Sequence, residues 1–130
     1  VLADAMVPNL LAATDKARSK PERVENEQFL RKLIGTQSIA TIQAALGALA
    51  DRPDMSEPMQ HFKKPVLLVC GKEDTITPPA AMESMAKILP QGQLVIVPEA
   101  GHLVPLEAPT VFQEAVLSFL GHLENTGERS

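Results

Sequence analysis

The most regular hydrophobic pattern in the chain lies between residues 64 and 107, where two short apolar runs flank a segment of helical periodicity. The runs are residues 66–70 (VLLVC) and 94–97 (LVIV), and neither contains a polar position. Such short aliphatic runs are typical of strands buried on both faces of a parallel sheet. Between them, apolar residues recur at helical spacing at Met82, Met85, Ala86 and Leu89. The region therefore predicts a parallel strand–helix–strand unit, whose helix is opened by Pro78 and Pro79.

The first fifty residues carry helical patterns only, and we predict a helical segment over residues 1–50. Pro8 should end a first helix, and the polar residues 14–20 should form a loop. A second helix is expected from Pro21 to Gly35, because proline suits the first helical turn and glycine a helix end. A third helix is indicated by apolar residues at helical spacing, namely Ile39, Ile42, Ala45, Leu46 and Leu49.

The pattern changes after residue 50, which divides the chain into further segments. Residues 51–63 read as a linker, since residues 51–58 alone contain two prolines and three acidic side chains. Residues 64–124 should form the α/β part, in which Pro109 opens a last amphipathic helix beside the strand–helix–strand unit. Residues 125–130 are polar and are expected to be a frayed tail. The predicted fold class is therefore α/β, preceded by helices.

Composition narrows the classes of function. With 130 residues, 45% of them hydrophobic and 22% charged, the chain fits one globular domain. The net charge is −4 and no long basic run is present, which argues against a nucleic-acid partner. No apolar run nears the roughly 20 residues of a membrane span, and the first residues do not resemble a signal peptide. Because Cys70 is the only cysteine, no disulfide can form within the chain, and we expect a cytoplasmic protein that does not bind membranes.

Two chemically useful side chains follow the predicted strands. Asp74 lies four residues after the first strand, and His102 lies five residues after the second. The carboxyl ends of parallel strands meet at one edge of a sheet, where catalytic groups gather, and neighbouring strands lie about 4.8 Å apart. A carboxylate–imidazole hydrogen bond there would fix the tautomer of the imidazole and stabilise its protonated form, as a general base requires. Gly101, directly before the histidine, permits a tight turn.

Other interpretations of these residues stay open. Asp74 could be a surface turn residue, with Glu73 as the rival acid, and His102 could be a loop histidine bonded to the backbone. Cys70 is expected to be a small buried hydrophobic residue, and His61 and His122 are expected on the surface. No Cys/His cluster has metal-ligand spacing and no glycine-rich loop suits a phosphate, so we expect neither a metal nor another cofactor.

In the segments PVLLVCGKEDTITPP and LVIVPEAGHLVPLEAP, the chain resembles the C-terminal portion of proteins of the α/β-hydrolase family. In that family the pattern P-x-L-x-x-x-G-x-x-D carries the acid of a catalytic triad, which falls on Asp74. The pattern G-H-x-x-x-x-E-x-P carries the triad histidine, which falls on His102, and its trailing acid falls on Glu107. The resemblance implies a structural role for Glu107, tying the histidine loop to the last helix. It covers residues 64–123 closely, and residues 1–50 are similar to the second half of the family's helical cap.

The resemblance is strongest to esterases, enol-lactonases and cofactor-free haloperoxidases, which implies a small apolar ester or lactone as substrate. The family's nucleophile lies in G-x-S-x-G, and that motif is absent here. None of the serines lies in a glycine-flanked turn after an apolar strand: Ser19, Ser38, Ser56, Ser84, Ser118 and Ser130. The alternative is an incomplete fragment or an interaction module without activity. The exposed strand edges would then favour a homo-oligomer, or association with a missing N-terminal part.

Overall fold

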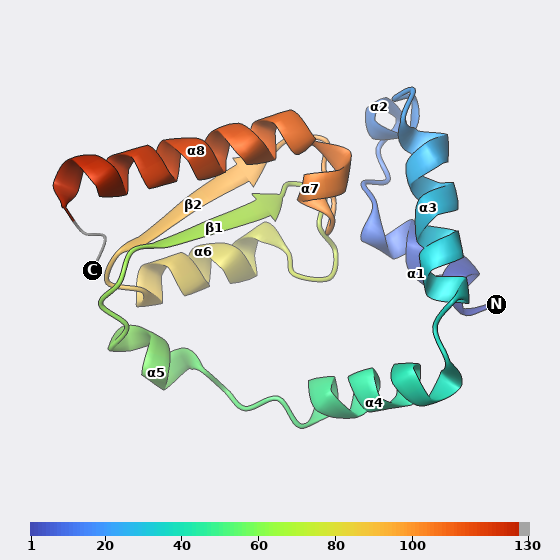
Figure 1. Cartoon of the computed structure of the whole chain (residues 1–130), viewed down its shortest axis with the longest axis horizontal. Coiled ribbons are helices and arrows are strands. Elements are labelled where there is room, and N and C mark those ends of the chain that lie inside the picture. Colours follow the sequence, from blue (N-terminus) through green and yellow to red (C-terminus); the bar gives the residue numbers. More distant parts are fainter. Residues whose placement is uncertain (128–130) are drawn as a thin grey trace.

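The computed structural model describes residues 1–127, which form eight helices and a two-stranded sheet (Figure 1). Residues 128–130 of the expected tail lie outside the described residues. In chain order the elements are α1 (Leu2–Leu10), α2 (Asp15–Arg18), α3 (Arg23–Gly35), α4 (Ile39–Ala50), α5 (Ser56–Gln60), β1 (Val66–Gly71), α6 (Pro79–Ile88), β2 (Gly92–Val97), α7 (Val104–Glu107) and α8 (Pro109–Thr126).

The sheet is a parallel pair formed by β1 and β2, in a register that runs from Val66 opposite Gly92 to Gly71 opposite Val97. Helix α6 connects the strands, and Figure 1 shows α6 and α8 on opposite sides of the pair. The predicted α/β class and parallel pairing are confirmed, and α6 and α8 begin at the predicted prolines, Pro79 and Pro109. Helix α8 continues to Thr126, two residues past the expected boundary at 124.

The strands are less buried than their composition predicts. Only Cys70, Gly71 and Val97 are buried, while most other strand residues are half-buried. The expectation of strands covered on both faces is therefore wrong for the described residues, because two strands and two helices leave much of a sheet uncovered. The buried side chains gather instead beyond the carboxyl end of β2, where Val97, Ala100 and Val104 form a core cluster.

A second core cluster joins α1 to α3 through Val7, Leu11 and Leu30. The prediction that the first helix ends at Pro8 is wrong, because α1 continues to Leu10. Proline removes one backbone hydrogen bond from a helix, but Val7 and Leu11 are only 1% and 2% exposed, and their burial favours a helix that continues across Pro8.

The polar segments also contain more helix than the sequence indicated. The expected loop at residues 14–20 includes α2, whose first turn is capped by the hydroxyl of Thr14 accepting from the Ala17 N–H. The expected linker at residues 51–63 includes α5. Helix α4 has no buried residue, and Ile39 is 76% exposed.

No single helix within residues 1–127 is long and apolar enough to cross a membrane. Helices α3 and α4 pass that test of length and composition only as a pair, and they are bent by 98° relative to each other.

Candidate active site

The carboxylate of Asp74 is held by its own loop, directly after β1. Its Oδ1 atom accepts hydrogen bonds from the backbone N–H groups of Ile76 (2.8 Å) and Thr77 (3.0 Å), and its Oδ2 atom accepts one from the Thr77 hydroxyl at 2.9 Å. Aspartate commonly organises turns in this way, by bonding to backbone groups two and three residues ahead. Asp74 is only 6% exposed, so the loop presents a buried carboxylate in a fixed orientation.

The histidine loop approaches the acid loop backbone to backbone. A Cβ atom on Gly71 would lie 2.1 Å from the carbonyl oxygen of Gly101, and a Cβ on Gly101 would lie 2.6 Å from the backbone nitrogen of Ala12. Both glycines are therefore needed for close packing of three chain segments. The backbone N–H of His102 donates to the carbonyl of Leu10 at 3.0 Å, which attaches the histidine loop to the end of α1.

Asp74 and His102 meet at the carboxyl edge of the sheet, as their spacing predicted. The distance between His102 Nδ1 and Asp74 Oδ2 is 3.0 Å, and the side chains are 32% and 4% exposed. An ionised carboxylate can only accept, so Nδ1 must carry a proton in this contact. In the neutral ring the lone pair then lies on Nε2, which is the arrangement of a general base.

Hydrogen bonds keep Asp74 ionised. Burial by itself raises the pKa of this carboxyl, but hydrogen bonds from the Thr77 N–H, His102, the Thr77 hydroxyl and the Ile76 N–H outweigh burial and hold the pKa below its usual value. The nearby Cys70 behaves oppositely, because burial, followed by the charge of Asp74, raises the pKa of its thiol. Cys70 is therefore an inert buried thiol in this environment.

Glu107, the last residue of α7 and two residues before the start of α8, anchors the histidine loop. Its Oε2 atom accepts from the Gly101 N–H at 2.7 Å, and its Oε1 atom accepts from the Ala12 N–H at 2.7 Å. The Nη1 atom of Arg23 lies 3.9 Å from Oε1 and donates to the Ala12 carbonyl at 2.5 Å. Glu107 and Arg23 are 7% and 9% exposed, so a buried ion pair joins the end of α7 to the start of α3.

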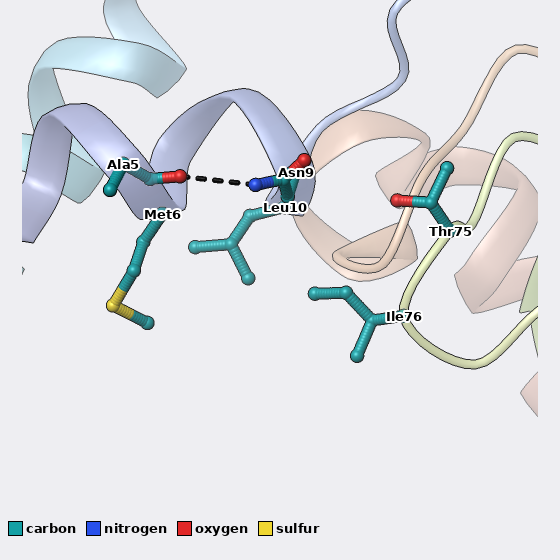
Figure 2. Close-up of a pocket in the computed structure, with 6 residues that line it drawn as sticks. All are labelled: Ala5, Met6, Asn9, Leu10, Thr75 and Ile76. Carbon is teal, nitrogen blue, oxygen red and sulfur yellow. Dashed lines mark hydrogen bonds between the residues drawn. The ribbon is translucent and has the colours of Figure 1, made fainter.

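A cavity of about 490 Å³ opens between α1 and the acid loop. Figure 2 shows Met6 and Leu10 of α1 on one side and Ile76 of the acid loop on the other. The remaining lining residues are Ala5, Asn9 and Thr75, so no charged side chain lines it. Asn9 binds back to α1, where its amide donates to the Ala5 carbonyl at 3.0 Å. The cavity adjoins the pair through backbone bonds, since Leu10 accepts from His102 and Ile76 donates to Asp74.

The other candidates from the sequence lie away from this pair. The backbone N–H of Glu73 donates to the Ala100 carbonyl at 2.9 Å, and within residues 1–127 the carboxylate that bonds to His102 is that of Asp74. His61 and His122 are exposed, and none of the serines among residues 1–127 hydrogen-bonds to His102. In that part of the chain no group of three or more His, Cys, Asp or Glu side chains could hold a metal ion.

Sequence reasoning missed Thr77 and the residues of the cavity. The position of Thr77, three residues after the aspartate, was a usable signal, because turn-forming aspartates bond to groups at that offset. Met6 and Leu10 gave no such signal, since they are separated from the acid loop by more than sixty residues.

Comparison with known proteins places these features in context. A family model described as alpha/beta hydrolase fold matches residues 8–109. The pimeloyl-[acyl-carrier protein] methyl ester esterase of Nitrosomonas europaea is 38% identical over 73 residues, which are 56% of this chain and 29% of that protein.

Solved structures agree over nearly the whole chain. A thermophilic esterase from Thermogutta terrifontis has a TM-score of 0.85 and 33% identity, covering 94% of this chain and 43% of its own. The enol-lactonase from Burkholderia xenovorans LB400 has a TM-score of 0.80 at 23% identity, covering 92% of this chain and 44% of its own, which is a likeness of fold. The chain thus spans less than half the length of each of these relatives.

Proposed function

Because this chain belongs to the α/β-hydrolase fold family, we propose that Asp74 and His102 are the acid and the base of a serine-hydrolase triad acting on carboxylic esters or lactones. The observation that carries this proposal is the 3.0 Å contact between His102 Nδ1 and a buried Asp74 carboxylate. That contact leaves Nε2 of the neutral imidazole as the proton acceptor.

Each half of the proposed reaction has two proton transfers through His102. Its Nε2 atom takes the hydroxyl proton of a serine as that oxygen attacks the ester carbonyl, and the imidazolium is stabilised by Asp74. The imidazolium then protonates the departing alcohol, and an acyl-enzyme remains. Water then attacks the acyl-enzyme and gives up a proton to His102. His102 returns this proton to the serine oxygen as the carboxylic acid is released. By the family pattern, the serine lies in a G-x-S-x-G turn outside these 130 residues.

The cavity indicates what kind of ester would bind. Met6, Leu10 and Ile76 give it an apolar lining, and it has no charged side chain to pair with an ionic substrate. Pockets of this size and lining suit uncharged, mainly apolar ligands. We therefore propose that the cavity receives the apolar acyl or alcohol group of a small neutral ester or lactone.

A chimera tests the proposal directly. The part of the Thermogutta terrifontis esterase that precedes its match with this chain would be joined to residues 1–130, and hydrolysis of p-nitrophenyl butyrate would be measured. The chimera should turn over the ester, and the isolated chain should not. His102→Ala should lower kcat by about 10³-fold or more, and Asp74→Asn should lower it strongly as well.

His122→Ala serves as the matched control, because His122 is exposed and lies on α8. Turnover should remain at the level of the unmodified chimera in this variant. An active chimera whose activity survives His102→Ala would refute the assigned role of His102.

A second candidate function is self-association without catalysis. Within the described residues, β1 and β2 pair only with each other, so each strand has a free edge that could pair with a second copy. Sedimentation of the isolated chain distinguishes this candidate, since a monomer at high concentration would count against it.

A further inference from the structure

Thr77 contacts both members of the Asp74–His102 pair. Its N–H donates to Asp74 Oδ1 at 3.0 Å and its hydroxyl donates to Asp74 Oδ2 at 2.9 Å, so it binds both oxygens of the carboxylate. The same hydroxyl oxygen lies 3.4 Å from Nδ1 of His102. Within residues 1–127, Thr77 is the one side chain that lies within hydrogen-bond distance of both the acid and the imidazole.

The positions of the protons follow from the chemistry of the three groups. Oδ2 of the ionised Asp74 can only accept, so it receives the hydroxyl proton of Thr77 and the Nδ1 proton of His102. The hydroxyl has one proton, which is now used, and a lone pair of its oxygen is left to face the Nδ1–H. If Nδ1 carried no proton, it would face Oδ2 at 3.0 Å as one acceptor against another.

We infer that Thr77 is a positioning residue for this pair: its hydroxyl holds Asp74 Oδ2 opposite Nδ1 and favours the tautomer in which Nε2 is the base. The inference rests on the proposed function, because the tautomer matters only if His102 accepts a proton through Nε2. Thr77 acts through Asp74 and His102 and has no contact with substrate in this role.

The backbone around Thr77 keeps the hydroxyl in place. Thr77 directly precedes Pro78, and a residue before proline is restricted to extended conformations. Its carbonyl oxygen lies 3.6 Å from the thiol sulfur of Cys70, which places it beside the end of β1. Thr77 itself is exposed, so its side chain can be replaced without opening a core.

Nitrogen-15 NMR of the histidine rings in the 130-residue chain tests the inference. Long-range proton–nitrogen spectra at about pH 8.5, above the ordinary titration range of histidine, report which ring nitrogen carries the proton. The spectrum of His102→Gln would identify the signals of His102, and the exposed His61 provides a reference ring. The compared variants are Thr77→Val, which removes the hydroxyl at constant shape, Thr77→Ser, which keeps the hydroxyl, and Asp74→Asn.

In the unmodified chain and in Thr77→Ser, His102 should be mainly in the Nδ1–H tautomer. In Thr77→Val the ratio of the Nε2–H to the Nδ1–H tautomer should rise about two- to tenfold, which corresponds to the loss of one ordinary hydrogen bond. A residue that only supported the loop would alter stability and leave this ratio unchanged. If Thr77→Val does not fold, Thr77→Ala compared with Thr77→Ser gives the same test, because those two side chains differ only by the hydroxyl.

The outcomes separate this inference from the proposed function. If Asp74→Asn leaves the tautomer ratio unchanged, the acid–imidazole pair itself is refuted, and the proposed function with it. If Asp74→Asn changes the ratio but Thr77→Val does not, only the role of Thr77 is overturned. Equal changes of the tautomer ratio in Thr77→Val and Thr77→Ser would also overturn the role of Thr77, because the hydroxyl would then not be the cause.

Discussion

Replacing Glu107 by glutamine should destabilise the chain well beyond the usual effect of a single substitution. The two carboxylate oxygens accept from two different backbone N–H groups, those of Ala12 and Gly101, each at 2.7 Å. Glutamine retains one acceptor oxygen and turns the other position into an NH₂ donor. That donor would face a buried backbone N–H, so one N–H would lose its partner.

The expected loss is about 3 kcal/mol of unfolding free energy. A hydrogen bond to a charged group contributes roughly 1.5–3 kcal/mol, and a buried polar group without a partner costs about 1–3 kcal/mol. These two terms overlap, because both describe the same N–H. The removal of the charge near Arg23, 3.9 Å away, adds to the loss in the same direction. The total unfolding free energy of a small domain is about 5–15 kcal/mol, so a loss of this size is large.

Urea unfolding followed by far-ultraviolet circular dichroism measures this effect, since the chain has no Trp or Tyr to report by fluorescence. The midpoint should fall while the slope of free energy against urea stays constant. Glu114→Gln is the matched control, because Glu114 is exposed on α8 and should change stability by no more than about 0.5 kcal/mol. If Glu107→Gln falls within the range of this control, the assigned contacts of Glu107 do not stabilise the fold.

The remaining predictions concern acid stability and the contact between the two loops. The pKa of Asp74 is lower in the folded chain than in the unfolded chain, so its ionisation stabilises the fold above about pH 4 and the stability is lost as pH falls below that value. Urea midpoints measured from neutral to acidic pH should therefore fall less steeply in Asp74→Asn than in the unmodified chain. An equal fall in both would contradict the lowered pKa of Asp74 in the folded chain. Gly71→Ala should unfold the chain or separate the loops, because its Cβ would lie 2.1 Å from the Gly101 carbonyl oxygen. Gly121→Ala in α8 meets nothing within 4 Å and should instead raise the thermal midpoint, since alanine is favoured over glycine by about 1 kcal/mol in a helix.

The sequence predicted features that depend on local signals. Continuous apolar runs indicated both strands, and the proline before each apolar stripe marked the starts of α6 and α8. The meeting of Asp74 and His102 was also predictable, because parallel strands joined by one helix bring the loops that follow them to the same edge. In each case the signal lies within a few residues of the feature that it predicts.

Features that depend on distant partners could not be predicted. The bond from Ala12 to Glu107 joins residues 95 positions apart, and neither sequence neighbourhood indicates the other. Continuation of α1 through Pro8 depends on burial against α3, which a propensity argument does not include. The strands are half-buried for a similar reason, since burial depends on how many neighbours a sheet has and not on the strand sequence.

The strand register explains why so small a sheet can still position the acid and the base. Asp74 and His102 follow adjacent strands, so their separation depends on the pairing of β1 with β2 and on two short loops. A slip of one residue would move one strand by about 3.3 Å, which is enough to break the 3.0 Å contact. Two further backbone bonds extend the pairing beyond the strands, from the Lys72 N–H to the Val97 carbonyl at 2.8 Å and from the Glu73 N–H to the Ala100 carbonyl at 2.9 Å. These bonds oppose a slip at the end of the sheet where the Asp74–His102 pair lies.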